Sequence, residues 1–330
     1  MFEEESKLLV ATQHGLVIFR YQDGRWQESK RALSEHNVIA VIARQGIILA
    51  GTSQGVFGSD DEGETWRTGD GLGSPHVCSL TYHPGVSDLE FAGTEPAGIF
   101  VSHDGGGHWR TCPEVEALRD HHRWFLPYSP EAGCVRSIAI CGRRAYAAVE
   151  VGGVLRSDDR GESWRLVGGS TGEPSFDLPP APFVFADVHW VATHSDSPDL
   201  VYAATAEGLY RSYDGGDTWT VSRAGSYCRA VWVDPLDSEH ILLSPADSVS
   251  RMNGRIERSR DGGRSWTPAS DGLGLPWPDR MVERFTNLAD HLVAITDDGC
   301  LYIASVSHMA WEPMLSDVPD IQAVARYPAG

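Results

Sequence analysis

One short motif recurs five times along the chain at regular intervals. Its pattern is S-x-D-x-G-x-[T/S/H]-W, and the copies are SDDEGETW (59–66), SHDGGGHW (102–109), SDDRGESW (157–164), SYDGGDTW (212–219) and SRDGGRSW (259–266). Two eroded copies flank them, one ending at Trp26 and one ending at Trp311. Seven Trp residues therefore stand in register, which indicates seven structural repeats and restricts the chain to a repetitive architecture.

Each copy lies between two short apolar runs, so it predicts a hairpin turn. The Ser and Asp side chains can accept hydrogen bonds from amides of the turn. The Gly adopts the positive φ that other residues resist, and the Trp is expected to pack over the turn. An Asp that stands in every repeat is a poor candidate for a catalyst, because one active site needs one constellation. We therefore assign the motif a structural role.

Two further strand-like runs precede each hairpin. In the second repeat they are VIAVIARQG and IILAGTSQG, and the same order recurs from Val77, Val135, Val188 and Cys228, and more loosely from Met281. Short runs rich in β-branched residues and bounded by Gly, Asp and Pro are typical of strands, and no convincing helical period is present. Four strands in a repeat of about 47 residues predict an all-β chain. The fold predicted for residues 1–330 is a single seven-bladed β-propeller of four-stranded antiparallel blades.

The two ends of the sequence predict how the ring closes. The opening run LLVATQHG corresponds to the second strand of a blade, and its missing first strand matches DIQAVARYP at residues 320–328. The C-terminal strand should therefore pair in blade one, which leaves no sheet edge at the seam. Truncation after about Asp320 should then cost more stability than loss of a tail.

The charge balance excludes some partners. The chain has 27 Lys+Arg against 46 Asp+Glu and a net charge of -19 at pH 7, and without a basic stripe it is not expected to bind nucleic acid. No apolar run reaches the ~18 residues that span a bilayer, so no membrane partner is expected. Acidic residues stand at the N-terminus where a signal peptide needs basic ones, and we expect a cytoplasmic protein.

The cysteines predict neither a disulfide framework nor a structural zinc site. They show no CxxC spacing and no even ladder. We expect no cofactor, and we expect all six cysteines to be buried free thiols: Cys78, Cys112, Cys134, Cys141, Cys228 and Cys300.

The repeated hairpins resemble those of the Asp-box (BNR) repeat proteins, and the resemblance covers essentially the whole chain. That superfamily includes sialidases, xyloglucanases, sortilin-type receptors and photosystem assembly factors, so the resemblance implies a propeller and leaves the activity open. Seven repeats differ from the six blades of sialidases, and the Arg-Ile-Pro motif of sialidases is absent from this sequence. A xyloglucanase implies two propellers facing a long cleft, whereas this chain supplies one.

Two long insertions indicate where a site could lie. The Trp-to-Trp interval is 55 residues at both insertions, against 40 for the shortest interval. Residues 112–134 lead into blade four and residues 168–189 lead into blade five, and long loops in compact domains are often functional. Both should rise over the same sector of the channel mouth, where they either hold a ligand or plug the channel with aromatic side chains. The first insertion supplies four candidate ligand-binding residues: His121, His122, Arg123 and Trp124.

Alignment of the first strands predicts a ring of side chains at the channel mouth. One residue from each blade occupies the equivalent position: Ile39, Cys78, Arg136, His189, Arg229, Glu283 and Gln322. Arg136 and Arg229 would suit a carboxylate or phosphate through bidentate contacts, and ion pairs with Glu150, Asp187 or Glu283 would explain them equally well. His189, Tyr227 and Glu283 complete the candidate ligand set.

Glu150 and Asp187 form the candidate catalytic pair. Glu150 falls in the turn between the second and third strands of blade four, and Asp187 lies in the second insertion. A glycosidase needs one protonated and one ionised carboxyl group. A metal held by Asp187 with His189, His76 or the pair His121 and His122 is an alternative, but no spacing such as HExxH supports it, and no metal ligand is predicted.

The leading hypothesis is a cytoplasmic propeller that binds a small anionic or sugar-like molecule at the channel mouth over blades four and five, with glycosyl hydrolase-like activity as its enzymatic form. Two other classes stay open. One is a non-catalytic protein-interaction or assembly scaffold, and the other is a metal-dependent hydrolase or lyase. A deep polar mouth favours the small molecule, and a large exposed apolar patch favours the scaffold.

Overall fold

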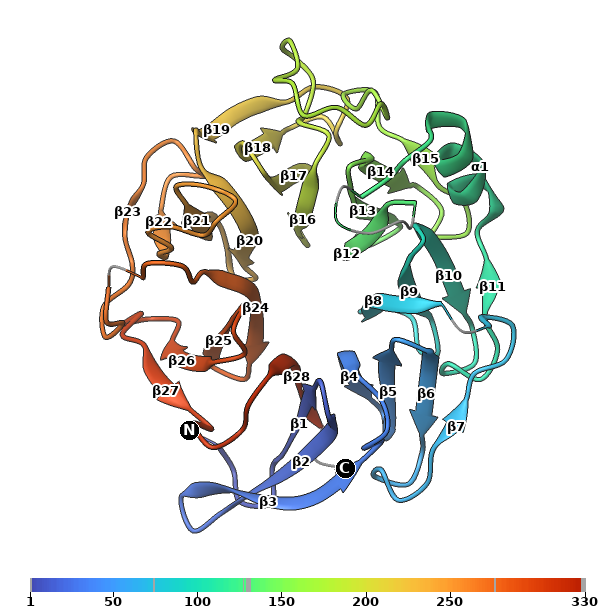
Figure 1. Ribbon diagram of the computed structural model, residues 1–330, viewed down its shortest axis with the longest axis vertical. Helices are drawn as coiled ribbons and strands as arrows, with labels where there is room; N and C mark the ends of the chain where they lie inside the picture. Colours follow the sequence, from blue (N-terminus) through green and yellow to red (C-terminus); the bar gives the residue numbers. More distant parts are fainter. Residues whose placement is uncertain (1, 74, 127, 129–131, 276, 328–330) are drawn as a thin grey trace.

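Seven four-stranded sheets stand around a central channel in the computed structural model (Figure 1). The structure describes all residues of the chain except 1, 74, 127, 129–131, 276 and 328–330. Every neighbouring pair of strands within a sheet is antiparallel. At the channel, for example, β12 pairs with β13 and β20 pairs with β21. The predicted seven-bladed β-propeller is therefore confirmed.

Each blade runs from its innermost strand at the channel to its outermost strand at the rim. Blades one to three consist of β28 (Ile321–Tyr327), β1 (Lys7–Thr12), β2 (Gly15–Gln22) and β3 (Arg25–Ala32), then β4 (Val38–Arg44), β5 (Ile47–Thr52), β6 (Gly55–Ser59) and β7 (Arg67–Thr68), then β8 (His76–Tyr82), β9 (Glu90–Glu95), β10 (Gly98–Ser102) and β11 (Arg110–Thr111). Blades four and five consist of β12 (Cys134–Cys141), β13 (Arg144–Glu150), β14 (Gly153–Ser157) and β15 (Arg165–Leu166), then β16 (Val188–His194), β17 (Ser197–Thr205), β18 (Gly208–Ser212) and β19 (Thr220–Ala224). Blades six and seven consist of β20 (Tyr227–Asp234), β21 (Asp237–Ala246), β22 (Glu257–Ser259) and β23 (Thr267–Pro268), then β24 (Val282–Leu288), β25 (His291–Thr296), β26 (Leu301–Ser305) and β27 (Glu312–Met314).

The ring closes in blade one, as the sequence predicts. Strand β28 pairs antiparallel with β1, from Lys7 opposite Tyr327 to Thr12 opposite Ile321. Blade one therefore takes its innermost strand from the far end of the sequence, and the inner edge of its sheet is covered.

The five complete motif copies form the predicted turns. In each copy the Ser hydroxyl donates to the Asp carboxylate over 2.7–2.9 Å. In blade three, the amide of Gly106 donates to Ser102 Oγ over 2.9 Å, and the indole Nε1 of Trp109 donates to the carbonyl of Gly106 over 3.0 Å. The Asp side chain makes its hydrogen bonds within its own turn, so the structural role predicted for the motif is confirmed.

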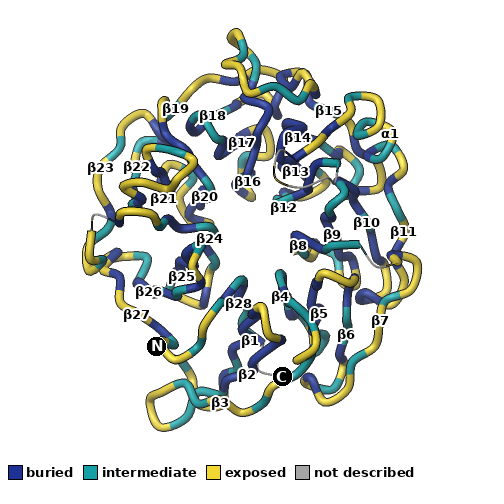
Figure 2. Tube along the Cα trace, viewed as in Figure 1, coloured by how far each residue is buried: buried dark blue, intermediate teal, exposed yellow. Residues whose placement is uncertain are grey.

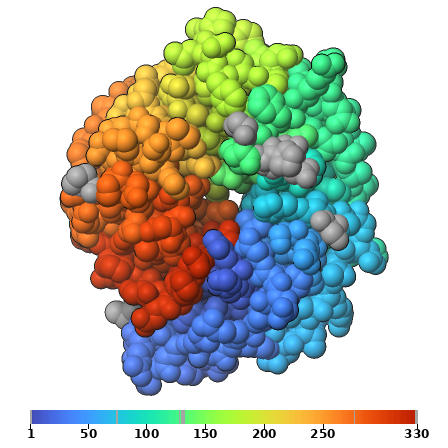
Figure 3. All heavy atoms as spheres, in the orientation of Figure 1, coloured from blue at the N-terminus to red at the C-terminus, as the bar shows by residue number. Residues whose placement is uncertain are grey.

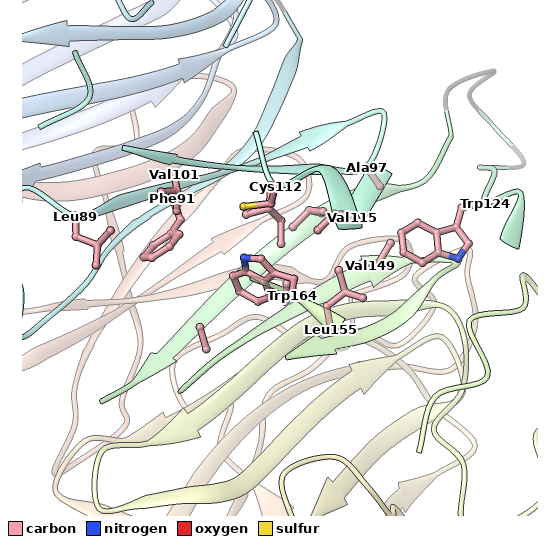
Figure 4. Packing of buried hydrophobic residues seen from close by; sticks show 14 residues of the cluster. Leu89, Phe91, Ala97, Val101, Cys112, Val115, Trp124, Val149, Leu155 and Trp164 are labelled. Carbon is pink, nitrogen blue, oxygen red and sulfur yellow. The ribbon is translucent and has the colours of Figure 1, made fainter. Parts of the chain in front are cut away.

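The hydrophobic core is divided into clusters between neighbouring blades. Between blades three and four, Phe91, Leu155 and Trp164 pack together (Figure 4). A Cβ placed on Gly161 would lie 2.1 Å from the Phe91 ring, and Gly161 has a φ of +83°, so the turn can approach this ring only with glycine. The innermost strands mix buried and half-buried residues, the second strands are largely buried, and exposed residues gather in the loops at the rim (Figure 2).

One helix was missed by the sequence analysis. Helix α1 (Pro113–His122) begins the first insertion and lies on the outside of the ring near β11 and β15 (Figure 1). Pro113 stands in its first turn together with Glu114 and Glu116, which complement the positive end of the helix dipole. Val115 is the one residue that helix α1 buries, so its sequence shows almost no periodic pattern of apolar residues from which the helix could be predicted. Within the described residues, no helix has the length and apolarity to cross a bilayer.

Candidate functional site

A β-bulge interrupts the innermost strand of every blade. In blade four, Val135 pairs with Val149 and Ser137 pairs with Ala148, so Arg136 is an extra residue without a counterpart in β13. A bulge turns the extra side chain away from its place in the ladder. The extra residues of the seven blades are the predicted ring: Gln322, Ile39, Cys78, Arg136, His189, Arg229 and Glu283.

All seven ring residues line one cavity at an end of the channel. The cavity has a volume of about 460 Å³, and the turns between second and third strands contribute Gln13, Glu95 and Asp297 to its wall. Figure 3 shows the molecule hollowed at the centre of the ring. We call this space the mouth cavity.

Among the residues of the mouth cavity that were not predicted, three carry a charge or an indole ring: Trp190, Arg251 and Arg284. Trp190 and Arg284 each follow a bulge residue directly, and a bulge sets two consecutive residues against one partner. A bulge expected at the ring position could therefore have identified both. Arg251 comes from the loop after β21 and pairs with Asp297. No local sequence pattern predicts that this side chain reaches the mouth cavity.

The ring is charged on one side. Blades four to seven contribute charged or titratable residues at the ring position: Arg136, His189, Arg229 and Glu283. Blades one to three contribute an amide, an aliphatic side chain and a thiol, those of Gln322, Ile39 and Cys78. The polar chemistry of the mouth is therefore concentrated over the sector that the sequence predicts, and it extends to blade seven.

Two arginines and two glutamates form an ion-pair network in the charged half. Arg136 Nε lies 3.2 Å from Glu150 Oε2, and Arg136 Nη2 lies 3.8 Å from Glu283 Oε2. Arg229 Nε lies 3.4 Å from Glu283 Oε1, and its Nη1 lies 3.9 Å from Glu150 Oε1. Burial alone would raise the pKa of Glu283, but Arg229 and Arg136 hold it below its usual value. The ion-pair alternative for the two arginines is thus realised.

His189 joins Asp187 to this network. Its Nδ1 donates to the carbonyl of Cys228 over 2.7 Å, and its Nε2 lies 3.4 Å from Asp187 Oδ1. The Tyr227 ring lies 4.9 Å from the His189 ring, and the Arg229 guanidinium lies 5.5 Å from the Tyr227 ring. Burial would raise the pKa of Asp187, but His189, Arg229 and Arg136 together hold it below its usual value. Asp187 is therefore a carboxylate at neutral pH.

The predicted catalytic carboxylates lie close together but below the surface of the cavity. One ligand atom from each of Glu150, Asp187 and His189 lies within 4.8 Å of the other two. Glu150 is 2% exposed and Asp187 is 9% exposed, and among the described residues neither carboxylate lines the mouth cavity. The pair therefore supports the ring residues from beneath.

The two insertions contact each other at the mouth side of the ring. The indole Nε1 of Trp124 donates to the carbonyl of Gly172 over 2.8 Å, and the rings of Phe125 and Phe176 lie 6.3 Å apart. The carbonyl of Ala132 accepts from the amide of Ala97, in a turn between second and third strands. The expectation that both insertions rise over the channel mouth is therefore met only in part, because Glu114 of the first accepts from the amide of Trp164 and Pro182 of the second accepts from the amide of Trp219, both in Ser–Asp hairpins.

The four candidate residues of the first insertion do not reach the mouth cavity. His121 and His122 end helix α1, and Arg123 follows with a φ of 55° as its C-cap. Trp124 is 2% exposed in the core beside blade four, and His122 stacks on it and pairs with Glu173. None of the four is among the described residues that line the mouth cavity. The structure does not bring these candidate ligand-binding residues to the ring, because the helix carries the histidines to the rim and Trp124 packs against the second insertion.

A second cavity of about 320 Å³ continues below the mouth cavity. Its wall combines aliphatic residues, such as Val41 and Leu80, with polar and charged ones, such as Asn287 and Arg326. Three residues line both cavities and therefore stand at their boundary: Arg136, Trp190 and Arg284. The Arg284 guanidinium lies 5.6 Å from the Trp190 ring, and burial together with the neighbouring Arg136 lowers the pKa of Arg284 to about 10.

The six cysteines are free thiols, and all except Cys300 are buried, as the sequence predicts. Cys78, the ring residue of blade three, has its sulfur 2.7 Å from that of Cys134. Glu95 offers a carboxylate oxygen within 4.8 Å of both sulfur atoms. This group spans blades three and four: Cys78 and Glu95 line the mouth cavity, and Cys134 stands opposite Glu150 in the pairing of β12 with β13.

Comparison with known proteins gives relatives of the same architecture. No protein-family model matches the chain. The oligoxyloglucan-reducing end-specific xyloglucanase of Emericella nidulans is 25% identical over 306 residues, which cover 76% of this chain and 36% of that protein. The chain thus spans about a third of the length of that curated relative.

Two solved structures support the fold. An ancestral GH74 enzyme superposes with a TM-score of 0.61 at 18% identity, covering 88% of this chain and 38% of that chain. YCF48 bound to D1 peptide superposes with a TM-score of 0.61 at 14% identity, covering 92% of this chain and 89% of that chain. The chain is therefore a propeller with GH74 xyloglucanase-like relatives, and it matches YCF48 in overall extent.

Proposed function

We propose that this chain is a glycosyl hydrolase-like propeller that binds a saccharide in the mouth cavity. The observation that carries the proposal is the composition of the ring and of the wall around it. Guanidinium groups, carboxylates and amides alternate there, and the Trp190 ring lies among them. A polyhydroxylated ligand needs donors and acceptors in alternation, together with one aromatic surface.

The balance of charges supports a neutral or weakly anionic sugar over a strongly charged ligand. Arg136 and Arg229 are already neutralised by Glu150 and Glu283. Arg284 stacks on Trp190 and keeps a positive charge at neutral pH, so a single carboxylate on the ligand would find a counter-charge. The kinship with a xyloglucanase agrees with a sugar ligand.

Calorimetric titration tests the proposal. The protein is titrated with xyloglucan oligosaccharides, neutral glucans and uronic-acid oligosaccharides, and released sugar is assayed in the same samples. The variant Arg251→Ala removes an exposed guanidinium from the mouth wall, and Arg264→Ala removes an exposed one that pairs with Glu239 in a Ser–Asp hairpin. We expect Arg251→Ala to weaken binding at least ~5-fold, the loss of about one charge-assisted hydrogen bond, and Arg264→Ala to bind as the wild type does. Absence of binding by every sugar, or equal loss in both variants, contradicts the proposal.

Recognition of a polypeptide is the second candidate. The match to YCF48 bound to D1 peptide covers nearly the whole of both chains, and the two insertions expose the apolar side chains of Phe125, Phe176 and Leu178. Phe176→Ser discriminates the two. It leaves a sugar in the mouth cavity unaffected, and it weakens a peptide that extends over the insertions.

A further inference from the structure

We infer that Glu150, Asp187 and His189 form a binding site for one divalent transition-metal ion beneath the mouth cavity. Glu150 ends β13 in blade four, Asp187 precedes β16, and His189 is the bulge residue of β16. One ligand atom from each lies within 4.8 Å of the other two, and the residues are 2%, 9% and 1% exposed, respectively. Two carboxylates and one imidazole are a donor set that transition metals bind.

The orientation of His189 supports this inference. Because a carbonyl can only accept, Nδ1 carries the proton that is donated to Cys228, and Nε2 is the ring nitrogen that faces Asp187 Oδ1, at 3.4 Å. A metal ion between this nitrogen and the carboxylate oxygen would give both buried atoms a partner. A carbonyl that holds the second ring nitrogen is also the usual support of a metal-binding histidine.

The ligand atoms are unsatisfied in the described part of the chain. His189 Nε2 and Asp187 Oδ1 are buried and have no hydrogen-bond partner among the residues that the structure describes; Glu150 Oε2 has no well-directed hydrogen bond there either, although Arg136 Nε lies 3.2 Å from it. Buried polar atoms are normally paired. The nitrogen and oxygen that face each other, with Glu150 beside them, therefore indicate a missing partner that accepts electron pairs.

The local charges leave room for a cation at Asp187. The carboxylates of Glu150 and Glu283 face the guanidinium groups of Arg136 and Arg229, and Arg284 also acts on Glu283. Among the described residues no guanidinium lies within ion-pair distance of Asp187, so a metal ion between it and His189 would be its direct counter-charge. The imidazole ligand favours Zn²⁺, Co²⁺ or Mn²⁺ over Mg²⁺ and Ca²⁺, which prefer oxygen ligands throughout.

Metal analysis of the purified protein, followed by titration of EDTA-treated protein with Zn²⁺, Co²⁺ and Mn²⁺, tests the inference. We expect one ion per chain and a rise in the thermal midpoint on binding, because the ion binds the folded state. Asp187→Asn should lower the affinity at least ~10-fold. Its matched control is Asp234→Asn, since Asp234 also pairs with a buried histidine, His240, over 2.9 Å but belongs to no three-ligand group in the described chain.

The visible spectrum of the Co²⁺-loaded wild type gives a readout that does not depend on variants folding. Ligand-field bands without a sulfur charge-transfer band agree with one imidazole and two carboxylates. A sulfur charge-transfer band that disappears in Cys134→Ser would assign the metal to the thiol group of Cys78, Cys134 and Glu95 and overturn the inference. Absence of binding by every ion would also overturn it. Because the probe is the metal ion alone and, among the described residues, Glu150 and Asp187 do not line the mouth cavity, these results do not depend on whether a sugar binds there.

Discussion

Arg136 and Arg229 contact the same carboxylate although they stand two blades apart in the ring. Arg136 Nε lies 3.2 Å from Glu150 Oε2, and Arg229 Nη1 lies 3.9 Å from Glu150 Oε1. The Glu150 side chain is 3% exposed, so its charge is balanced by the arginines and not by water. Glu150 thus ties blade four to blade six across the channel.

Glu150→Gln should lower the free energy of unfolding by about 2–4 kcal/mol, because removing one partner leaves buried charges without compensation. The measurement is urea denaturation at pH 7. The control is Glu162→Gln, whose carboxylate is 44% exposed and contacts Arg110 at 2.6 Å; its loss should stay below about 1 kcal/mol. Equal losses in the two variants would show that the network contributes no more than a surface pair.

Removal of β28 should destabilise the whole ring. A chain that ends at Val318 exposes β1 and removes the buried side chains of Ile321, Val324 and Tyr327. We expect the thermal midpoint to fall by at least ~10 °C, as followed by far-ultraviolet circular dichroism. A synthetic peptide of residues 319–330 added to the truncated chain should raise the midpoint again. A midpoint that does not change on truncation would refute the closure of blade one.

Trp124→Ala should loosen the contact between the two insertions. The side chain is buried, and its indole donates to Gly172, so we expect a loss of about 3–5 kcal/mol in the free energy of unfolding. Phe125→Ala is the neighbouring control, because Phe125 is 42% exposed, and its effect should be within about 1 kcal/mol. Limited proteolysis should cut residues 168–187 faster in Trp124→Ala than in Phe125→Ala. Similar cleavage rates would argue that Trp124 does not fasten the second insertion.

Stability should depend on the protonation of Glu90. This carboxyl is 7% exposed, and burial, followed by the charge of Asp88, raises its pKa to about 7. Since the folded state holds a proton that the unfolded state releases above its own pKa of 4.5, this stabilisation is complete below pH 4.5 and is lost as the pH rises through 7. Glu90→Gln should therefore exceed the wild type in free energy of unfolding by about 1–3 kcal/mol at pH 8.

The check is chemical denaturation of Glu90→Gln and wild type at pH 5 and pH 8. The gain should shrink at pH 5, where the wild-type carboxyl is largely protonated. Glu312→Gln, at an exposed position in β27, should show no such pH dependence. A gain of equal size at both pH values would contradict the assignment of the titration to Glu90.

The fold could be predicted because its information is local. Each Ser–Asp hairpin makes its hydrogen bonds within a few residues, as at Ser102 and Asp104. Five copies therefore reveal the length of the repeat, and the number of repeats predicts the number of blades in the ring. The ring residues could be predicted for the same reason, since equivalent positions in equivalent strands must meet at the channel.

The site could be predicted only in part because its contacts cross blades. Nothing near Arg136 in the sequence indicates that Glu283, three blades further on, lies 3.8 Å from it. The sequence also does not indicate whether an aromatic side chain in a long loop points into the core or toward solvent. Trp124 turns into the core and Phe125 turns toward solvent, although they are neighbours.

The bulges have a consequence for how such a molecule can be altered. Each ring residue stands outside the pairing of its strand with the next, so its side chain can be exchanged while the neighbouring ladder bonds stay intact. A library that varies Ile39, Cys78 and Gln322 would leave the charged network in place. The uncharged half of the ring is therefore the natural starting point for engineering new specificities into this scaffold.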